Sequence, residues 1–265
     1  MPQAKTPAKR TAKRAPKAPA ARTTLAEAMR ALEGAGTAQA RKIYARHGAR
    51  DPMFGVSFAF LKGLSKRIGV DHELALALWD TGNFDARNLA VKVVDPARMS
   101  PADLDRWARE NGVPMCGLYV AAVAAEGPHA PAKASQWLAS EDVIQRCTAW
   151  GLVGQMASRD VATPDSWFAA RLGEIERTIR AAPDAERAAM NQAVIAIGGR
   201  SAALRKAALA AAGRIGKVEV DHGDTSCKTP EAAAYIGKMW ARAAEKSFAS
   251  PAAQERERES PRTRC

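Results

Sequence analysis

Side chains that could do chemistry gather in one short stretch near the C-terminus of the sequence. This stretch spans residues 220–230 and contains Asp221, His222, Asp224 and Cys227. Zinc sites normally take four ligands at clear spacing, and one weak cluster falls short of that, so no metal is predicted. We favour a structural interpretation in which the two aspartates make side-chain turns and Gly223 relieves the backbone. His47, His72 and His129 stand in capping or turn contexts that predict no catalytic role.

Basic side chains are concentrated in the first 22 residues. The 265-residue chain has 40 Lys and Arg against 28 Asp and Glu, a formal net charge of +12. Residues 1–22 contribute +7 and residues 250–265 contribute +1, which leaves +4 for residues 23–249. The arm has no large apolar side chain after Met1, so we expect it to be disordered. It is suited to a polyanion such as nucleic acid, with contacts from Lys9, Arg10, Lys13 and Arg14. The alternative is a solubilising terminus without a specific partner.

Composition excludes several classes of protein. Apolar residues make up 47% of the chain, which is enough for a core and excludes wholesale disorder. The longest apolar runs, such as residues 117–125, fall well short of the ~18 residues of a spanning helix, so no membrane partner is expected. The four cysteines lie far apart, without the paired spacing of a redox dithiol. We therefore expect a cytoplasmic protein without a cofactor.

Helix-start signals recur along the sequence and predict an all-α fold. Ser100-Pro101, Thr163-Pro164 and Thr229-Pro230 each place a hydroxyl at the N-cap and a proline at the first helical position. Helices of about 10 to 18 residues joined by short turns indicate an α-solenoid or an irregular helical array. We assign residues 23–249 to a single helical domain and residues 250–265 to a disordered, mixed-charge tail.

Two stretches of the sequence go beyond a general helix pattern. The first is DPMFGV at residues 51–56, followed by LWDTGNFDAR at residues 78–87, and the second is VDHGDTSCKTP at residues 220–230. They resemble parts of the DNA alkylation repair enzyme family, and the resemblance covers most of residues 25–245. It implies HEAT-like α-α repeats stacked around a basic concave groove. It also implies excision of N3- or N7-alkylated purines from DNA by hydrolysis of the glycosidic bond.

The resemblance implies a catalytic aspartate that this sequence lacks. In the family's characterised glycosylases, a Trp is followed four residues later by an Asp that stabilises the developing oxocarbenium ion. Those two positions fall near Val113 and Gly117, and no carboxylate occurs between Glu110 and Glu126. A second groove Trp, expected near Ala196, is also missing.

Other residues are candidates for contacts with DNA. Gln145-Arg146, followed by Trp150, resembles the family segment whose Arg contacts the phosphate backbone, so Arg146 is the leading candidate for a bidentate phosphate contact. Arg205 and Lys206 would reach a phosphate if their helix lines the groove. Each basic residue has an ordinary alternative as part of a solvated helix surface.

The sequence therefore predicts a DNA-binding protein of the alkylation repair type, which holds duplex DNA mainly through its phosphates. Excision of alkylpurines would require a replacement carboxylate, for which Asp221 and Asp224 are the candidates, provided that one is positioned and partly desolvated. The alternative is a non-catalytic helical-repeat module that binds DNA or a protein or peptide. In a bacterium, we expect the protein to be cytoplasmic and associated with the nucleoid.

Overall fold

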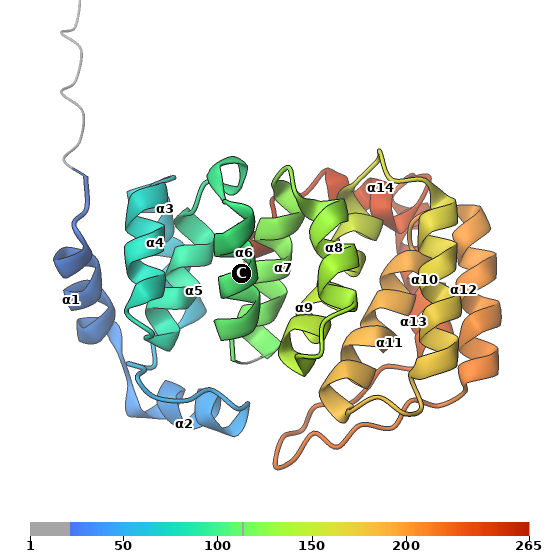
Figure 1. Cartoon of the computed structure of the whole chain (residues 1–265), viewed down its shortest axis with the longest axis horizontal. Coiled ribbons are helices and arrows are strands. Elements are labelled where there is room, and N and C mark those ends of the chain that lie inside the picture. The colour runs from blue at the N-terminus through green and yellow to red at the C-terminus, as the bar shows by residue number, and fades with distance from the viewer. Residues whose placement is uncertain (1–21, 113, 265) are drawn as a thin grey trace, which may run out of the picture.

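The computed structural model describes residues 22–112 and 114–264. Within these residues, the secondary structure consists of fifteen α-helices and one 3-10 turn, and β pairing is limited to an isolated bridge between Gly36 and Val56. The helices form an elongated array that runs from α1 at one end to α12 at the other (Figure 1). The prediction of an all-α fold is confirmed. None of the helices in the described ranges is long and apolar enough to cross a membrane.

The helices fall into an inner layer, an outer layer and two terminal segments. The inner layer comprises α3 (Phe58–Ile68), α5 (Phe84–Val93), α7 (Pro114–Glu126), α9 (Val143–Arg159), α11 (Asp184–Gly198) and α13 (Ala232–Glu245). The outer layer comprises α4 (His72–Asp80), the turn η1 (Pro96–Arg98), α6 (Pro101–Glu110), α8 (Ala130–Leu138), α10 (Asp165–Thr178) and α12 (Ala202–Ile215). The chain begins with α1 (Leu25–Ala35) and α2 (Ala38–Arg46) and ends with α14 (Pro251–Arg256) and α15 (Pro261–Arg264).

The inner helices α7, α9, α11 and α13 run parallel, because the contacts between neighbours advance in the same direction along both helices. The contacting pairs are Gly117 with Thr148, Ala121 with Gly151, Arg146 with Glu186, Gly154 with Ala196, Asn191 with Pro230, and Gly198 with Ile236. The outer helix α4 runs antiparallel to α5, since the backbone N–H of Asp71 at its start donates to Val93 O at the end of α5. We call the side of the array where α5, α7, α9 and α11 end the C-terminal edge.

Four tryptophans fill the core between the layers. Trp79, Trp107, Trp137 and Trp150 are fully buried. Trp79 and Trp107 stack with ring centroids 4.1 Å apart and planes 8° apart, which joins α4 to α6. These tryptophans therefore pack the core and offer no surface on which a base could stack.

The two parts of the N-terminal motif, residues 51–56 and 78–87, meet in space and hold the fold together. The Asp85 carboxylate is completely buried and accepts hydrogen bonds from the backbone N–H groups of Phe54, Gly55 and Val56 at 2.6, 3.0 and 2.8 Å. Gly55 has a φ of 82°, and a Cβ there would lie 2.5 Å from Thr37 O. Only glycine fits that position. The motif is therefore a structural joint between α5 and the loop that follows α2.

The prediction of a disordered tail over residues 250–265 is wrong for residues 250–264. Ser250 caps α14 by accepting a hydrogen bond from the Ala253 N–H at 3.1 Å, and the charged residues that follow pair with distant helices. Glu255 pairs with Arg159, and Arg262 pairs with Glu126. The mixed charge that suggested a solvated end therefore belongs to an ordered segment, which we call the C-terminal strap. In Figure 1, α14 lies along the upper edge of the array.

Candidate nucleic-acid interface

Gly117, near which the resemblance implies a catalytic aspartate, is buried on α7. A Cβ at this position would lie 3.0 Å from Asn111 Oδ1 and 3.6 Å from Thr148 Oγ1. Asn111 Nδ2 donates to Thr148 Oγ1 at 2.9 Å, and both side chains are buried. The space beside Gly117 is thus filled by a neutral hydrogen-bonded pair, which leaves no room for a carboxylate without rearrangement. Val113, the position implied for the preceding Trp, lies outside the described residues.

The two candidate replacement carboxylates lie in solvent. Asp221 and Asp224 are exposed in the loop between α12 and α13, which projects from the lower edge of the array in Figure 1. Asp221 Oδ1 accepts from the Gly223 N–H at 2.8 Å, which is the side-chain turn predicted from the sequence. The desolvation that a catalytic carboxylate needs is missing at both positions. His222 Nε2 shares a hydrogen bond with Thr229 Oγ1 at 2.9 Å. Within residues 22–112 and 114–264, no group of His, Cys, Asp or Glu side chains is arranged to hold a metal ion.

Arg146 makes an internal ion pair. Its Nε and Nη2 donate to the two carboxylate oxygens of Glu186 at 2.9 and 2.8 Å, which is a bidentate pair between α9 and α11. Its Nη1 donates to Ser140 O and Glu141 O at 2.8 and 2.9 Å. The Glu186 side chain is only 6% exposed. A phosphate contact from Arg146 would have to break this pair, so the structure gives the residue a structural role.

The other two residues of that segment do not reach the surface. Gln145 is 6% exposed and Trp150 is 2% exposed. Their Nε2 and Nε1 atoms are buried without a hydrogen-bond partner. The prediction that they contact DNA is therefore contradicted by their burial. Their helix α9 packs against helices before and after it in the chain, which local patterns in the sequence do not reveal.

The predicted basic residues of α12 lie near a second basic helix. The Arg205 guanidinium stacks over the Trp240 ring of α13 at 4.9 Å, and Lys206 is exposed. The sequence interpretation missed three exposed cations on α13 and the end of that helix: Lys238, Arg242 and Lys246. Together with Tyr235, which is 48% exposed, they form a surface that we call the α13 stripe. Their spacing of four residues was the available signal, because it puts successive cations on one face of a helix.

The α13 stripe carries a net positive charge. Glu245 is the single acid within α13. Lys238, Arg242 and Lys246 have no ion-pair partner within the described ranges, so their charges remain available to an anion. An aromatic side chain beside unpaired cations can bind nucleic acid by stacking and phosphate contacts. Of the basic residues predicted in the arm, Lys9, Arg10, Lys13 and Arg14 lie outside the described residues.

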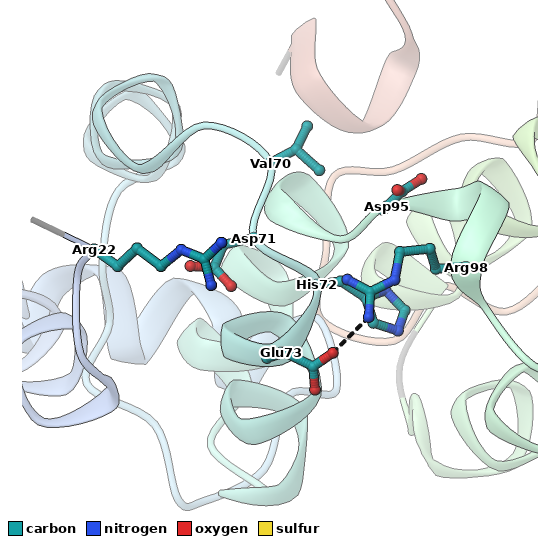
Figure 2. Close-up of a pocket in the computed structure, with 7 residues that line it drawn as sticks. All are labelled: Arg22, Val70, Asp71, His72, Glu73, Asp95 and Arg98. Atoms are coloured by element: carbon teal, nitrogen blue, oxygen red, sulfur yellow. Dashed lines mark hydrogen bonds and ion pairs between the residues drawn. The ribbon is translucent and has the colours of Figure 1, made fainter. Parts of the chain in front are cut away.

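A cavity of about 180 Å³ lies at the start of α4, near Arg22 (Figure 2). It is lined by Arg22, Val70, Asp71, His72, Glu73, Asp95 and Arg98. Each carboxylate serves the fold, since Asp71 caps α4, Asp95 caps the turn η1, and Glu73 pairs with Arg98 at 2.6 Å. Three carboxylates against two guanidinium groups make the cavity unsuited to a phosphate.

Two partly buried groups with shifted pKa values also serve structure. Burial, with the nearby Glu186 charge, raises the pKa of the Cys147 thiol to about 11, so this thiol is protonated and unreactive at neutral pH. At Asp105, burial favours the neutral acid, but hydrogen bonds from Lys133 and Trp137 outweigh it and lower the pKa of the carboxyl. Lys133 Nζ and Trp137 Nε1 both donate to Asp105 Oδ1 at 2.7 Å. Neither group is poised for proton transfer near pH 7.

Comparison with known proteins shows the family. The pattern of the DNA alkylation repair enzyme family matches residues 28–236. The uncharacterized protein Lin0241 of Listeria innocua is 27% identical over 216 residues, which cover 79% of this chain and 93% of that protein. The uncharacterized protein Lmo0209 of Listeria monocytogenes is 26% identical over the same shares of the two chains.

A solved structure matches the array with a TM-score of 0.76 and 30% sequence identity, and the match covers 83% of this chain and 95% of that chain. It is described as a new family of proteins related to the HEAT-like repeat DNA glycosylases, with affinity for branched DNA structures. The HEAT-like architecture predicted from the sequence is confirmed. Because the family pattern spans nearly all of the array from α1 to α13, the chain belongs to the DNA alkylation repair enzyme family.

Proposed function

We propose that this protein binds DNA through phosphate contacts, prefers branched DNA to linear duplex, and leaves alkylated bases in place. The observation that carries the last part is the packing around Gly117. The buried Asn111–Thr148 pair fills the space where the family's glycosylases are expected to place a carboxylate. Without an anionic side chain beside the deoxyribose, the developing oxocarbenium ion has no electrostatic stabilisation from the protein.

Two basic surfaces support DNA as the partner. Residues 1–22 contribute +7 of the net charge of +12, and the α13 stripe adds unpaired cations at the far end of the array from α1. The arm joins the described chain at Arg22, just before α1, whereas the stripe lies on α13 toward the opposite end of the array (Figure 1). Two cationic segments attached at opposite ends of an elongated array suit a ligand with more than one duplex arm better than a short straight duplex. The affinity for branched DNA of the structurally similar protein supports the same preference.

Fluorescence anisotropy tests the binding preference. A labelled four-way junction and a linear duplex of equal length are titrated with the full chain over a series of salt concentrations. We expect the junction to bind roughly tenfold tighter or more, a difference of about 1.4 kcal/mol. Affinity for both should fall steeply with salt, since each phosphate contact contributes about 0.9 to the slope of log K against log salt.

A variant without residues 1–21 provides the matched comparison. We expect weaker binding and a smaller salt slope, because cations that release counterions have been removed. Equal affinity for junction and duplex would refute the branched-DNA preference. Absence of binding at low salt would refute DNA as the partner and favour a protein or peptide ligand.

A further inference from the structure

The C-terminal strap crosses the array in the reverse order of the chain. After α13, it contacts the ends of α11, α9 and α7 one after another, and then a side chain from within α3. Ala252 N donates to Gly199 O, just after α11, at 3.0 Å, and Arg159 at the end of α9 donates to Glu255 O and Arg258 O at 3.0 and 2.9 Å. Arg262 pairs with Glu126 at the end of α7 at 2.8 Å. Lys62 Nζ of α3 donates to Arg264 O at 2.6 Å. Residues 252–264 thus tie together helices whose sequence positions span the whole array.

Arg262 is the central contact of the strap. It is only 7% exposed, and its Nη1 donates to Val91 O and Lys92 O at 3.0 Å and to Val94 O at 3.4 Å. Its Nε donates to the Glu126 carboxylate at 2.8 Å. One guanidinium therefore satisfies the last carbonyls of α5 and binds the carboxylate at the end of α7.

The charge of the strap suits the edge on which it lies. The last carbonyls of a helix have no partner within the helix, and this end carries the negative pole of the helix dipole. Parallel inner helices place several such ends side by side on the C-terminal edge. Arg262 meets this need at α5, where it donates to backbone carbonyls, and at α7 it pairs with the side chain of Glu126. At the end of α9, Arg159 donates to a carbonyl of the strap. The contact is therefore a built interface rather than a chance packing of the tail.

The strap also differs from the contacts that normally hold a helical-repeat array. In such arrays, each repeat touches only its neighbours, so small rotations between repeats set the overall curvature. A segment that spans several repeats restrains all of those rotations together. The strap begins at residue 250 and lies outside the family match, which ends at residue 236.

We propose that the C-terminal strap is an intramolecular clamp, which fixes the curvature of the array by holding the ends of α5, α7 and α9 in register. Opening of the clamp loosens these helix ends and changes the shape that the array presents to its ligand. The first statement stands on the contacts of the strap alone. The effect on a branched DNA ligand rests on the proposed function.

The test compares Arg262→Ala with Arg256→Ala in the full-length chain. Arg256 is an exposed strap residue without an ion-pair partner in the described part of the chain, so it is the matched control. Hydrogen–deuterium exchange is measured at the last turns of α5 and α7. We expect exchange there to rise about tenfold or more in Arg262→Ala and to stay unchanged in Arg256→Ala.

A chain ending at Ala249 provides the second variant, with small-angle X-ray scattering as the readout. We expect it to keep its helical circular dichroism and to show a changed radius of gyration and maximum dimension. Native exchange rates in Arg262→Ala, or a native scattering profile in the shortened chain, would overturn the clamp. Loss of all helical signal in the shortened chain would also overturn it, because the strap would then belong to the core.

The DNA experiment is kept separate from these readouts. We expect Arg262→Ala to reduce the ratio of junction affinity to duplex affinity, with the salt slope unchanged because no DNA-contacting cation is removed. Exchange and scattering are measured without DNA. If the exchange and scattering results support the clamp but the protein binds no DNA, the proposed function alone is refuted. If Arg262→Ala keeps native exchange at the helix ends and a normal preference for the junction, the clamp alone is refuted.

Discussion

The ion pair between Arg146 and Glu186 allows a quantitative test of the structural role assigned to Arg146. Arg146→Ala removes both hydrogen bonds to a carboxylate whose side chain is 6% exposed. Breaking one side of a fully buried pair costs about 3–5 kcal/mol. The Arg146 side chain is 22% exposed, so water replaces part of the loss and we expect about 2–4 kcal/mol. For a domain of this size, that corresponds to a fall in Tm of about 5–15 °C.

Thermal unfolding followed by circular dichroism measures this effect. Arg109→Ala is the control, because Arg109 is exposed and has no ion pair among the residues described; its Tm should shift by less than about 2 °C. Replacement of Arg146 and Glu186 together by Met should restore much of the stability, since no unpaired charge then remains buried. Glu186→Gln alone should destabilise less than Arg146→Ala, because the neutral amide leaves no buried anion.

The opposite pattern would refute this interpretation. If Arg146 instead binds a phosphate, Arg146→Ala should leave Tm unchanged, weaken DNA binding and lower the salt slope by about one. In that case, the pair with Glu186 would be a resting contact that DNA replaces.

Three further predictions follow from single groups. Lys238→Ala combined with Arg242→Ala should weaken binding to all DNA substrates and lower the salt slope by about two, as measured by anisotropy. Iodoacetamide at pH 8 should modify the exposed Cys227 and leave Cys147 unmodified, because burial raises the pKa of Cys147 to about 11; mass spectrometry of the two peptides checks this. The lowered pKa of Asp105 stabilises the protein above the ordinary value of 3.8, and this contribution is lost as pH falls through the lower folded value. Asp105→Asn should therefore lower Tm at neutral pH and weaken the dependence of Tm on pH below about 4.

Local sequence signals predicted much of the fold. Ser100 caps the helix that it was expected to start. Thr163 and Thr229 lie just before their helices, whose N-caps are Pro164 and Glu231. These signals act over three or four residues, so they can be read directly from the chain. The family resemblance could also be read from short motifs, residues 51–56 and 78–87. The structure shows that Asp85 joins these two motifs through hydrogen bonds.

The site was harder to predict because its contacts join distant parts of the chain. Arg146 finds its partner 40 residues away at Glu186, and Arg262 finds carbonyls 168 to 171 residues away. No local pattern distinguishes such an Arg from one that faces solvent. The strap has the composition of a disordered tail, and its order depends on helix ends that only the assembled array brings together. The sequence alone showed that the expected catalytic carboxylate is missing between Glu110 and Glu126. Only the structure revealed the Asn111–Thr148 pair beside Gly117.

The central claim is that this family member binds branched DNA without excising bases, and one experiment measures both properties in the same sample. A labelled four-way junction that carries an N7-alkylated purine is saturated with excess protein, binding is followed by anisotropy, and released base is quantified by chromatography. We predict a saturated complex and no release above the rate in buffer alone. Release of the base at a rate that rises with the amount of bound protein would contradict the account.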